Sequence, residues 1–227
     1  MLLQVLYYII CIELSERRNV LNNKVGIMGG TFDPIHYGHL VIANEVLFKF
    51  DLQKIIFVPT GNPPHKRSVA LADSYHRYMM TQFATMTNQD FDVSNIEVEK
   101  ESISYTVDTI RVLKDHYKNT KLFFITGTDA VLDLPNWKAP EEILKLCTFI
   151  SVNRPGYVTD TLEDKLDKLM EKYNGEILSI RAPQLKISST DIRNRIKEGR
   201  PTKYLLPENV EQYILKKGLY KIDDRKK

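Results

Sequence analysis

The chain has 227 residues, of which 43% are hydrophobic and 27% are charged. This length and apolar share predict one sizeable folded core and exclude a disordered or collagen-like chain. Lys and Arg number 32 against 29 Asp and Glu, for a net charge of +3, which is too balanced to indicate a nucleic-acid-binding protein. The two cysteines, Cys11 and Cys147, are too few for a disulfide framework or a structural zinc site, so a cytoplasmic setting is expected.

Residues 1–22 differ from the rest of the chain. The segment from Met1 to Ile12 is almost entirely apolar, yet it is too short to cross a membrane as a helix. It also lacks the basic residues before and the small residues after that mark a secretory signal. We expect 1–22 to be an extension outside the domain that results from an upstream translation start, with a peripheral membrane anchor as the alternative. The domain is expected over 23–220, followed by a charged tail over 221–227.

From Lys24 onward, short apolar runs alternate with amphipathic ones. Strands are predicted at 24–28, 54–58, 91–98, 122–126, 148–152 and 176–180. Helices are predicted at 40–50, 73–86, 106–117, 162–173, 190–197 and 208–216. The alternation predicts an α/β fold: a Rossmann-like, doubly wound parallel sheet with helices on both faces and a short C-terminal helical region. In such sheets, ligands bind at the carboxyl ends of the strands.

The segment from Gly29 to His39 leaves the first strand and enters a helix. It matches neither the dinucleotide pattern G-x-G-x-x-G nor a Walker A loop. Gly29 and Gly30 permit close approach of a ligand to the backbone, while His36 and His39 are spaced to share one face of a helix start. Free N–H groups there predict a phosphate site. Zinc ligation would require a third ligand nearby, and a helix cap plus a surface histidine is the other alternative.

A second polar segment runs from Ile187 to Arg193. Ser188 is predicted to cap a helix whose third residue is Asp191, which is a common arrangement without functional meaning. Ser189 and Thr190 add hydroxyl groups to the first turn, and Arg193 follows one turn later. Hydroxyl donors and an arginine at a helix start are suited to a triphosphate.

These two segments resemble the nucleotidyltransferase superfamily, whose H-x-G-H and I-S-S-T-x-I-R motifs match here in the same order. The longer stretch from Gly29 to His39 resembles the bacterial nicotinate-nucleotide adenylyltransferases. The resemblance implies transfer of the adenylyl group of ATP to nicotinic acid mononucleotide in NAD biosynthesis, giving deamido-NAD and pyrophosphate. The residues alone indicate only a phosphate site at the end of a strand in a Rossmann-like fold.

The resemblance also implies roles for individual residues. The catalytic residues would be His36, His39 and Arg193. ATP would be bound by Gly29, Gly30, Thr31, Phe32, His36, His39, Gly127, Asp129, Ser188, Ser189, Thr190 and Arg193. The mononucleotide would be bound by Asp33, Lys66, Tyr105, Thr106, Trp137 and Arg154.

The mononucleotide residues have simpler alternatives. Lys66 and Arg154 lie in loops, where such side chains are usually solvated. The segment from Ser104 to Thr109 could be an ordinary helix cap rather than a site for the pyridine carboxylate. Trp137, the sole tryptophan, is expected on a surface turn, where its ring could stack on the pyridine. Its neighbour Lys138 replaces an aromatic residue that some relatives have.

The implied mechanism is direct in-line attack of the mononucleotide 5′-phosphate on the α-phosphorus of ATP. The attacking oxygen is already anionic, so catalysis is expected to consist of positioning and electrostatic stabilisation. Mg²⁺ is expected to be bound chiefly through ATP phosphates and water, without a dedicated set of protein ligands. Another nucleotidyltransferase, such as a phosphopantetheine adenylyltransferase, and a non-catalytic nucleotide sensor remain alternatives. No nucleic-acid or membrane partner is expected, and a homodimer is left open.

Overall fold

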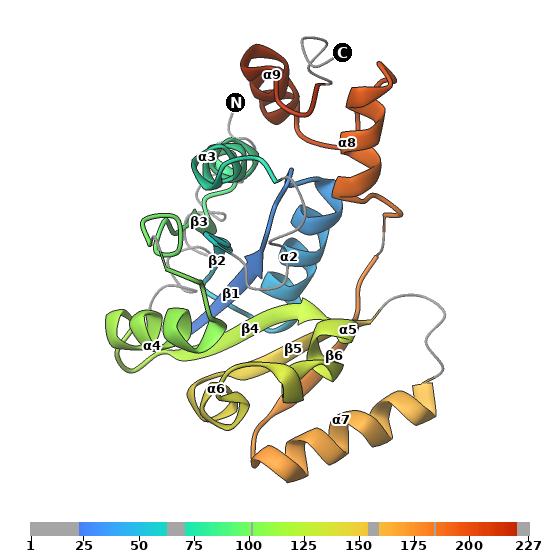
Figure 1. Ribbon diagram of the computed structural model, residues 1–227. Helices are drawn as coiled ribbons and strands as arrows, with labels where there is room; N and C mark the ends of the chain where they lie inside the picture. Colours follow the sequence, from blue (N-terminus) through green and yellow to red (C-terminus); the bar gives the residue numbers. More distant parts are fainter. Residues whose placement is uncertain (1–22, 63–70, 101, 154–158, 184, 222–227) are drawn as a thin grey trace, which may run out of the picture.

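The computed structural model describes residues 23–62, 71–100, 102–153, 159–183 and 185–221 (Figure 1). Six parallel strands form one sheet in the order β3-β2-β1-β4-β5-β6. The strands are β1 Lys24–Gly30, β2 Lys54–Pro59, β3 Phe91–Val93, β4 Lys121–Gly127, β5 Thr148–Asn153 and β6 Ile177–Arg181. This order places the first strand of each half, β1 and β4, next to one another, which is the doubly wound Rossmann-like topology predicted from the sequence.

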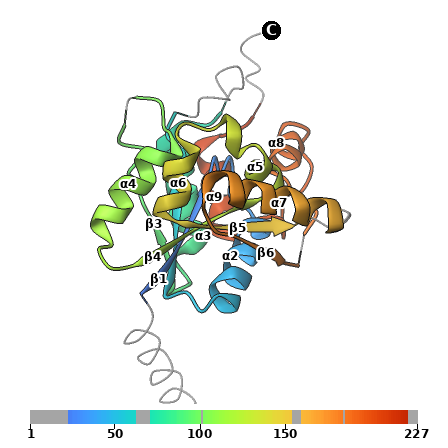
Figure 2. The same ribbon diagram turned by 90° about the horizontal axis from the view of Figure 1, so that it is seen from below.

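The helices are α2 Tyr37–Lys49, α3 Ser74–Thr85, α4 Thr106–His116, α5 Thr128–Leu132, α6 Pro140–Leu146, α7 Thr159–Tyr173, α8 Ser189–Lys197 and α9 Glu208–Lys217, with a 3-10 turn, η1, at Leu134–Asn136. Each face of the sheet has its own apolar cluster. One cluster includes residues of α2, α3, α8 and α9, and the other includes residues of α4, α6 and α7. Figures 1 and 2 show these two groups of helices on opposite sides of the sheet.

The neighbours of β1 differ in how far their pairing extends. Pairing of β1 with β2 continues to Gly30 and Pro59, whereas pairing of β1 with β4 ends at Met28 and Ile125. The last residues of β1 and β4 therefore separate at the carboxyl edge of the sheet. This is the switch point at which doubly wound sheets bind ligands.

The structure differs from the predicted elements in two places. The strand expected over 91–98 is only Phe91–Val93. The amide of Ser94 still donates to Phe57 O on β2, but the chain then turns, with the amide of Val98 donating to Asn95 O. Ser and Asn favour such turns. The short helices α5 and α6 were not predicted, although Pro140 at the first position of α6 and two glutamates in its first turn are typical of a helix start.

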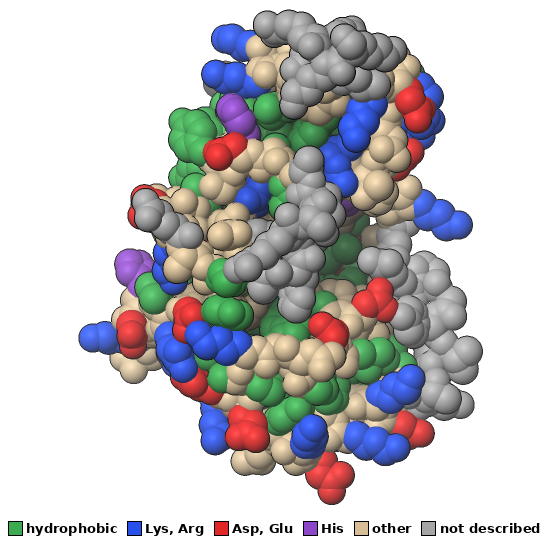
Figure 3. Space-filling view, viewed as in Figure 1, with side chains coloured by type: hydrophobic (Ala, Val, Ile, Leu, Met, Phe, Trp, Pro, Cys, Tyr) green, Lys and Arg blue, Asp and Glu red, His purple; other side chains and the backbone are tan. Residues whose placement is uncertain are grey.

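Among the residues that the structure describes, no helix combines the length and apolar character needed to span a membrane. Figure 3 shows Lys and Arg side chains interspersed with Asp and Glu over one face of the molecule. The charge is therefore mixed on that face.

Candidate active site

A cavity of about 870 Å³ opens at the carboxyl ends of β1 and β4. Its lining includes residues 28–33 from the end of β1, His36 and His39 at the start of α2, Thr126 and Gly127 at the end of β4, and residues 185–190 with Arg193 around the start of α8. The two polar segments identified in the sequence thus meet in one cavity. A hydrogen bond joins them between Ser189 and Pro34, which lie 155 positions apart in the chain.

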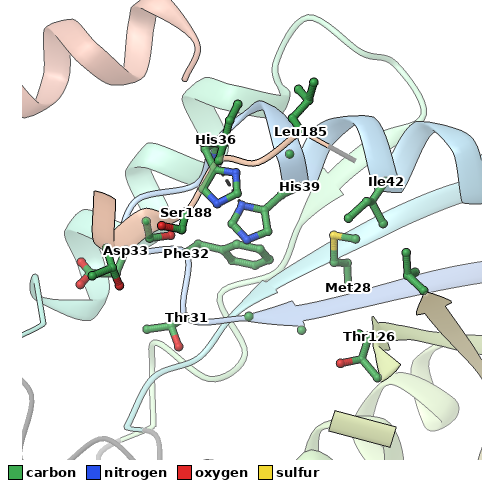
Figure 4. Close-up of a pocket in the computed structure, with 18 of the residues that line it drawn as sticks. Met28, Thr31, Phe32, Asp33, His36, His39, Ile42, Thr126, Leu185 and Ser188 are labelled. Carbon is green, nitrogen blue, oxygen red and sulfur yellow. Dashed lines mark hydrogen bonds between the residues drawn. The ribbon is translucent and has the colours of Figure 1, made fainter. Parts of the chain in front are cut away.

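The histidine pair is stacked. The rings of His36 and His39 lie 3.8 Å apart between centroids, with 24° between their planes, so the two imidazoles share one face as their spacing predicted. The backbone amide of His36 donates to His39 Nδ1 at 3.2 Å (Figure 4). Because Nδ1 accepts that bond, the proton of the neutral His39 ring is on Nε2. Phe32 supports the pair with an edge-to-face contact to His39, 5.2 Å between centroids.

Both histidines are neutral at pH 7. Burial lowers the pKa of His36 to about 4, and burial together with the neighbouring His36 lowers the pKa of His39 to about 3. Each neutral ring can therefore offer one N–H donor to a ligand but no positive charge. This refines the sequence interpretation, in which the imidazoles added to the positive end of a helix.

Two glycines permit this arrangement. A Cβ on Gly38 would lie 3.0 Å from Cε1 and Nδ1 of His36, so the missing side chain lets the imidazole pack against the helix. A Cβ on Gly30 would lie 2.8 Å from the ring of Phe32, whose own φ of 49° turns the chain sharply. Gly30 is therefore needed for the turn of the chain as well as for the ligand approach expected from the sequence.

The start of α8 is bonded to the loop that follows β1. Ser188 is the N-cap and its Oγ accepts from the amide of Asp191 at 3.1 Å, as the sequence predicted. Ser189 Oγ donates to Pro34 O at 2.8 Å, and Arg193 Nη1 donates to Asp33 O at 2.7 Å. Since these bonds join the two sides of the cavity, the helix start and the histidine pair hold a fixed relative position.

The residues expected around the pyridine ring lie elsewhere. Of the described residues, those that line the cavity do not include Tyr105, Thr106 or Trp137. Tyr105 is the N-cap of α4 and Thr106 its first residue, while Asp129 is in the first turn of α5, beyond Gly127. Their predicted roles remain predictions. Lys66 and Arg154 lie outside the described residues.

Trp137 is not the exposed side chain that its turn context predicted. It is partly buried and its ring packs at 6.1 Å from the rings of both Phe124 and Phe149. The Nζ of Lys138 lies 4.3 Å above the Tyr105 ring. Ser104, considered as a possible cap, is instead buried, and its Oγ accepts from the amide of Asn62 at 3.4 Å.

Sequence reasoning missed Arg77, which is 1% exposed. Its guanidinium donates to three backbone carbonyls: Thr31 O at 2.8 Å, Gly61 O at 2.9 Å and Ala72 O at 3.0 Å. It thereby joins the segment after β1 to the segment after β2. An arginine within an amphipathic helix pattern is usually solvent-exposed, so no sequence signal distinguished this one.

The cavity suits an anion. The polar side chains in its wall are chiefly N–H and O–H donors, from His36, His39, Thr190 and Arg193. Over the described ranges, no group of three or more His, Cys, Asp or Glu side chains is arranged to hold a metal ion. Such a donor set fits phosphate oxygens.

Comparison with known proteins agrees with the geometry. Residues 27–195 match the cytidylyltransferase-like family. A protein of Thermoanaerobacter sp., named a probable nicotinate-nucleotide adenylyltransferase, is 52% identical over 88% of this chain and 96% of its own length. One of the same name from Moorella thermoacetica is 49% identical over 87% of this chain and 92% of its own.

A solved structure extends the fold comparison. Plasmodium falciparum nicotinic acid mononucleotide adenylyltransferase, in complex with NaAD, has a TM-score of 0.69 at 21% identity, covering 87% of this chain and 97% of that one. At that identity the likeness concerns the fold alone. The sequence relatives show more, because they align with this chain over nearly all their length at 49–52% identity. The chain therefore belongs to the nicotinate-nucleotide adenylyltransferase family, within the cytidylyltransferase-like proteins.

Proposed function

We propose that this protein transfers the adenylyl group of ATP to nicotinic acid mononucleotide, producing deamido-NAD and pyrophosphate. The observation that carries the proposal is the single cavity in which the stacked histidines face the start of α8. A polyphosphate needs donors from more than one direction, and this cavity supplies them from two helix starts. The family to which the chain belongs supports the choice of substrates.

The reaction is a direct displacement. A 5′-phosphate oxygen of the mononucleotide forms a bond to the α-phosphorus of ATP, the bond from that phosphorus to the bridging oxygen breaks, and pyrophosphate leaves with the electron pair. No base is needed, because the attacking oxygen is already an anion. The difficulty is to bring two anions together and to stabilise charge on the leaving group, which is a task for fixed donors.

The residues of the cavity divide this task. His36 and His39 would donate from neutral rings to oxygens of the α- and β-phosphates, where charge builds up in the transition state. Thr190, Arg193 and the amides at the start of α8 would bind the β- and γ-phosphates. Ser189 would act mainly by holding α8 in place, since its hydroxyl already donates to Pro34 O.

Mg²⁺ fits this site as a companion of the nucleotide. The donors in the wall suit phosphate oxygens better than a cation, so the ion would be held by the phosphates and by water, as Mg²⁺ prefers. Arg193 and Thr190 would hold the phosphates that carry it. When bound, it would neutralise negative charge on the leaving pyrophosphate.

The mononucleotide is assigned to the side of the site near α4. The first amides of α4, just after Tyr105, would be suited to a carboxylate, and Trp137 would offer an aromatic surface for the pyridine. Lys66 and Arg154 complete the proposed set for its phosphate and ribose, and Asp129 that for ATP. The Asp33 side chain is 2% exposed, so we assign it to the network under the cavity and not to the mononucleotide.

Pyrophosphate release tests the proposal. The full chain is incubated with ATP, Mg²⁺ and, in separate reactions, nicotinic acid mononucleotide, nicotinamide mononucleotide or phosphopantetheine. We expect rapid release with the first, slower release with the second and none with the third. Fastest release with phosphopantetheine would assign another transferase activity, and tight ATP binding without turnover of any acceptor would assign a nucleotide sensor.

A further inference from the structure

The carboxylate of Asp33 is at the centre of a buried polar network under the cavity. Its side chain is 2% exposed. Oδ1 accepts from the Tyr220 hydroxyl at 2.7 Å and from the amide of Ala72 at 3.2 Å. The other oxygen, Oδ2, has no hydrogen-bond partner among the described residues. A buried carboxylate oxygen without a partner is unusual, and it requires an explanation.

Arg193 and Arg77 both interact with the charge of this carboxylate, and Arg193 is at ion-pair distance of Oδ2. Its Nη1 lies 3.6 Å from Asp33 Oδ2, which is an ion-pair distance but too long for a hydrogen bond. The same Nη1 instead donates to the backbone carbonyl of Asp33 at 2.7 Å, and Nη2 is 3.4 Å from Thr190 Oγ1. These contacts use only part of the five N–H groups of a guanidinium. Arg193 is therefore held at the cavity wall with donors left for a ligand.

Tyr220 reaches Asp33 from the far end of the chain, 187 positions away. It follows α9, which ends at the left-handed Gly218, and Tyr220 is itself left-handed, with φ of 64°. That conformation is unfavourable for a residue with a Cβ, so the contacts of the side chain must hold it. Burial and the neighbouring Asp33 raise the pKa of the Tyr220 hydroxyl, which keeps it protonated and able to donate.

We propose that Tyr220 is a positioning residue for the triphosphate: it fixes the Asp33 carboxylate and thereby keeps the Arg193 guanidinium available to ATP. The inference rests on the proposed function only in assigning Arg193 to ATP. The turn after α9 therefore contributes to ATP binding, although Tyr220 does not itself line the cavity. Figure 1 shows α9 and α8 at the same end of the molecule.

The physical reason is competition for one cation. With Oδ1 bound by the tyrosine hydroxyl, Oδ2 stays beyond hydrogen-bond distance of Arg193. Without that hydroxyl, Oδ1 keeps only the longer bond from the amide of Ala72, so the carboxylate can turn and accept directly from the guanidinium. A carboxylate and a phosphate can each accept two parallel N–H bonds from a guanidinium. An Asp33 carboxylate bonded directly to Arg193 would therefore compete with ATP for the same donors.

The chain supplies a matched control in Tyr213. This residue of α9 also joins the C-terminal part to α3, through a hydrogen bond of 2.8 Å between its hydroxyl and His76 Nδ1. Among the described residues, its side chain contacts His76 and Phe83 and neither Asp33 nor Arg193. Tyr213→Phe therefore also removes one tyrosine hydroxyl bond of the C-terminal part. It leaves the contacts among Tyr220, Asp33 and Arg193 in place.

The first experiment compares the two variants of the full chain. Tyr220→Phe should weaken ATP binding, measured by calorimetry, and raise the KM for ATP by about tenfold, the change that corresponds to roughly 1.4 kcal/mol. The KM for the mononucleotide should stay within about twofold of wild type. Tyr213→Phe should leave both KM values unchanged. Equal effects of the two variants, or an unchanged affinity of Tyr220→Phe for ATP, would overturn the inference.

A second experiment asks whether Tyr220 acts through Arg193. In an Arg193→Ala background, adding Tyr220→Phe should change ATP affinity by less than about twofold, because the group it positions is absent. The same tenfold loss in both backgrounds would show that Tyr220 acts by another route. Calorimetry with ATP alone needs no acceptor, so a failure of the proposed reaction with nicotinic acid mononucleotide would leave this test intact.

Discussion

At the carboxyl ends of β1 and β4, the candidate site is built from strand ends and helix starts, whereas the region around Trp137, proposed to bind the mononucleotide, is built from side chains that pack over the sheet. The phosphate end has its donors assembled: the histidine rings are stacked 3.8 Å apart and α8 is bonded to Pro34 and Asp33. At the end proposed for the mononucleotide, Trp137 packs on two phenylalanines and the Nζ of Lys138 lies over the Tyr105 ring.

The difference shows which parts of a nucleotide site depend on backbone and which on side-chain packing. The phosphate end uses backbone amides at two helix starts, and side-chain bonds from Ser189 and Arg193 to backbone carbonyls hold these starts together. Recognition of an aromatic ring needs an exposed aromatic face. Substitution of one neighbouring residue can cover or expose that face. This difference between the two regions leads to four predictions.

The largest effect is expected from His39→Ala. Removing one fixed donor to the transition state should lower kcat by about a hundredfold or more, while thermal unfolding shows that the variant is still folded at the assay temperature. His116→Ala is the control, since His116 ends α4 and contacts Tyr117, away from the cavity. A near-normal kcat for His39→Ala in steady-state assays would assign this residue to packing with Phe32 and His36.

Trp137→Ala tests the other end of the site. Loss of the indole from Phe124 and Phe149 should lower the free energy of unfolding by about 2–3 kcal/mol, as for a partly buried aromatic side chain. If the ring also stacks on the pyridine, the KM for the mononucleotide should rise several-fold with the KM for ATP unchanged. Urea unfolding and steady-state kinetics measure the two effects separately, and equal kinetic losses for both substrates would refute stacking.

The histidine pair predicts a pH dependence of stability. Both pKa values are lower in the folded chain, about 4 for His36 and about 3 for His39, than the ordinary value of 6.5. The unfolded chain therefore binds more protons below about pH 6.5, and stability falls as the pH decreases from there toward 4. Between about pH 7 and pH 5 the loss should be on the order of 1–2 kcal/mol per histidine. A His36→Asn, His39→Asn double variant, unfolded in urea at both values, should lose less; equal losses would contradict the assignment.

The smallest effect is expected from Gly38→Ala. The new Cβ would lie 3.0 Å from the His36 ring, which cannot move away freely because it is stacked on His39. We expect a loss of kcat of up to about tenfold. Stability should stay the same or rise, since alanine favours a helix over glycine by about 1 kcal/mol. Thermal unfolding measures the change in stability, and pyrophosphate release measures the change in kcat. An unchanged kcat would mean that the His36 imidazole can shift without loss of activity.

The sequence allowed the phosphate end to be predicted because its signals are local. Two glycines at a strand end and the spacing of His36 and His39 specify a helix start with shared faces, and Ser188 with Asp191 specifies a cap. The strand alternation predicted the sheet, and only the turn after Val93 and the short helices α5 and α6 were missed. Local signals of this kind can be recognised in the sequence without knowledge of the tertiary structure.

Other features could not be predicted because they depend on burial. The neutral state of the histidines follows from how deeply the rings are packed, which spacing does not reveal. The Pro and Asn residues before Trp137 correctly indicated a turn, now seen as η1, but not that the indole folds back over Phe124. Tyr220 meets Asp33 only in the folded chain, so no pattern in the sequence connects them.

Arg77 has a consequence for how the rim of the cavity fluctuates. One guanidinium holds the carbonyls of Thr31, Gly61 and Ala72, so none of these three segments can detach without breaking its bond to the same side chain. We expect their amides to exchange with solvent deuterium together, as one cooperative unit.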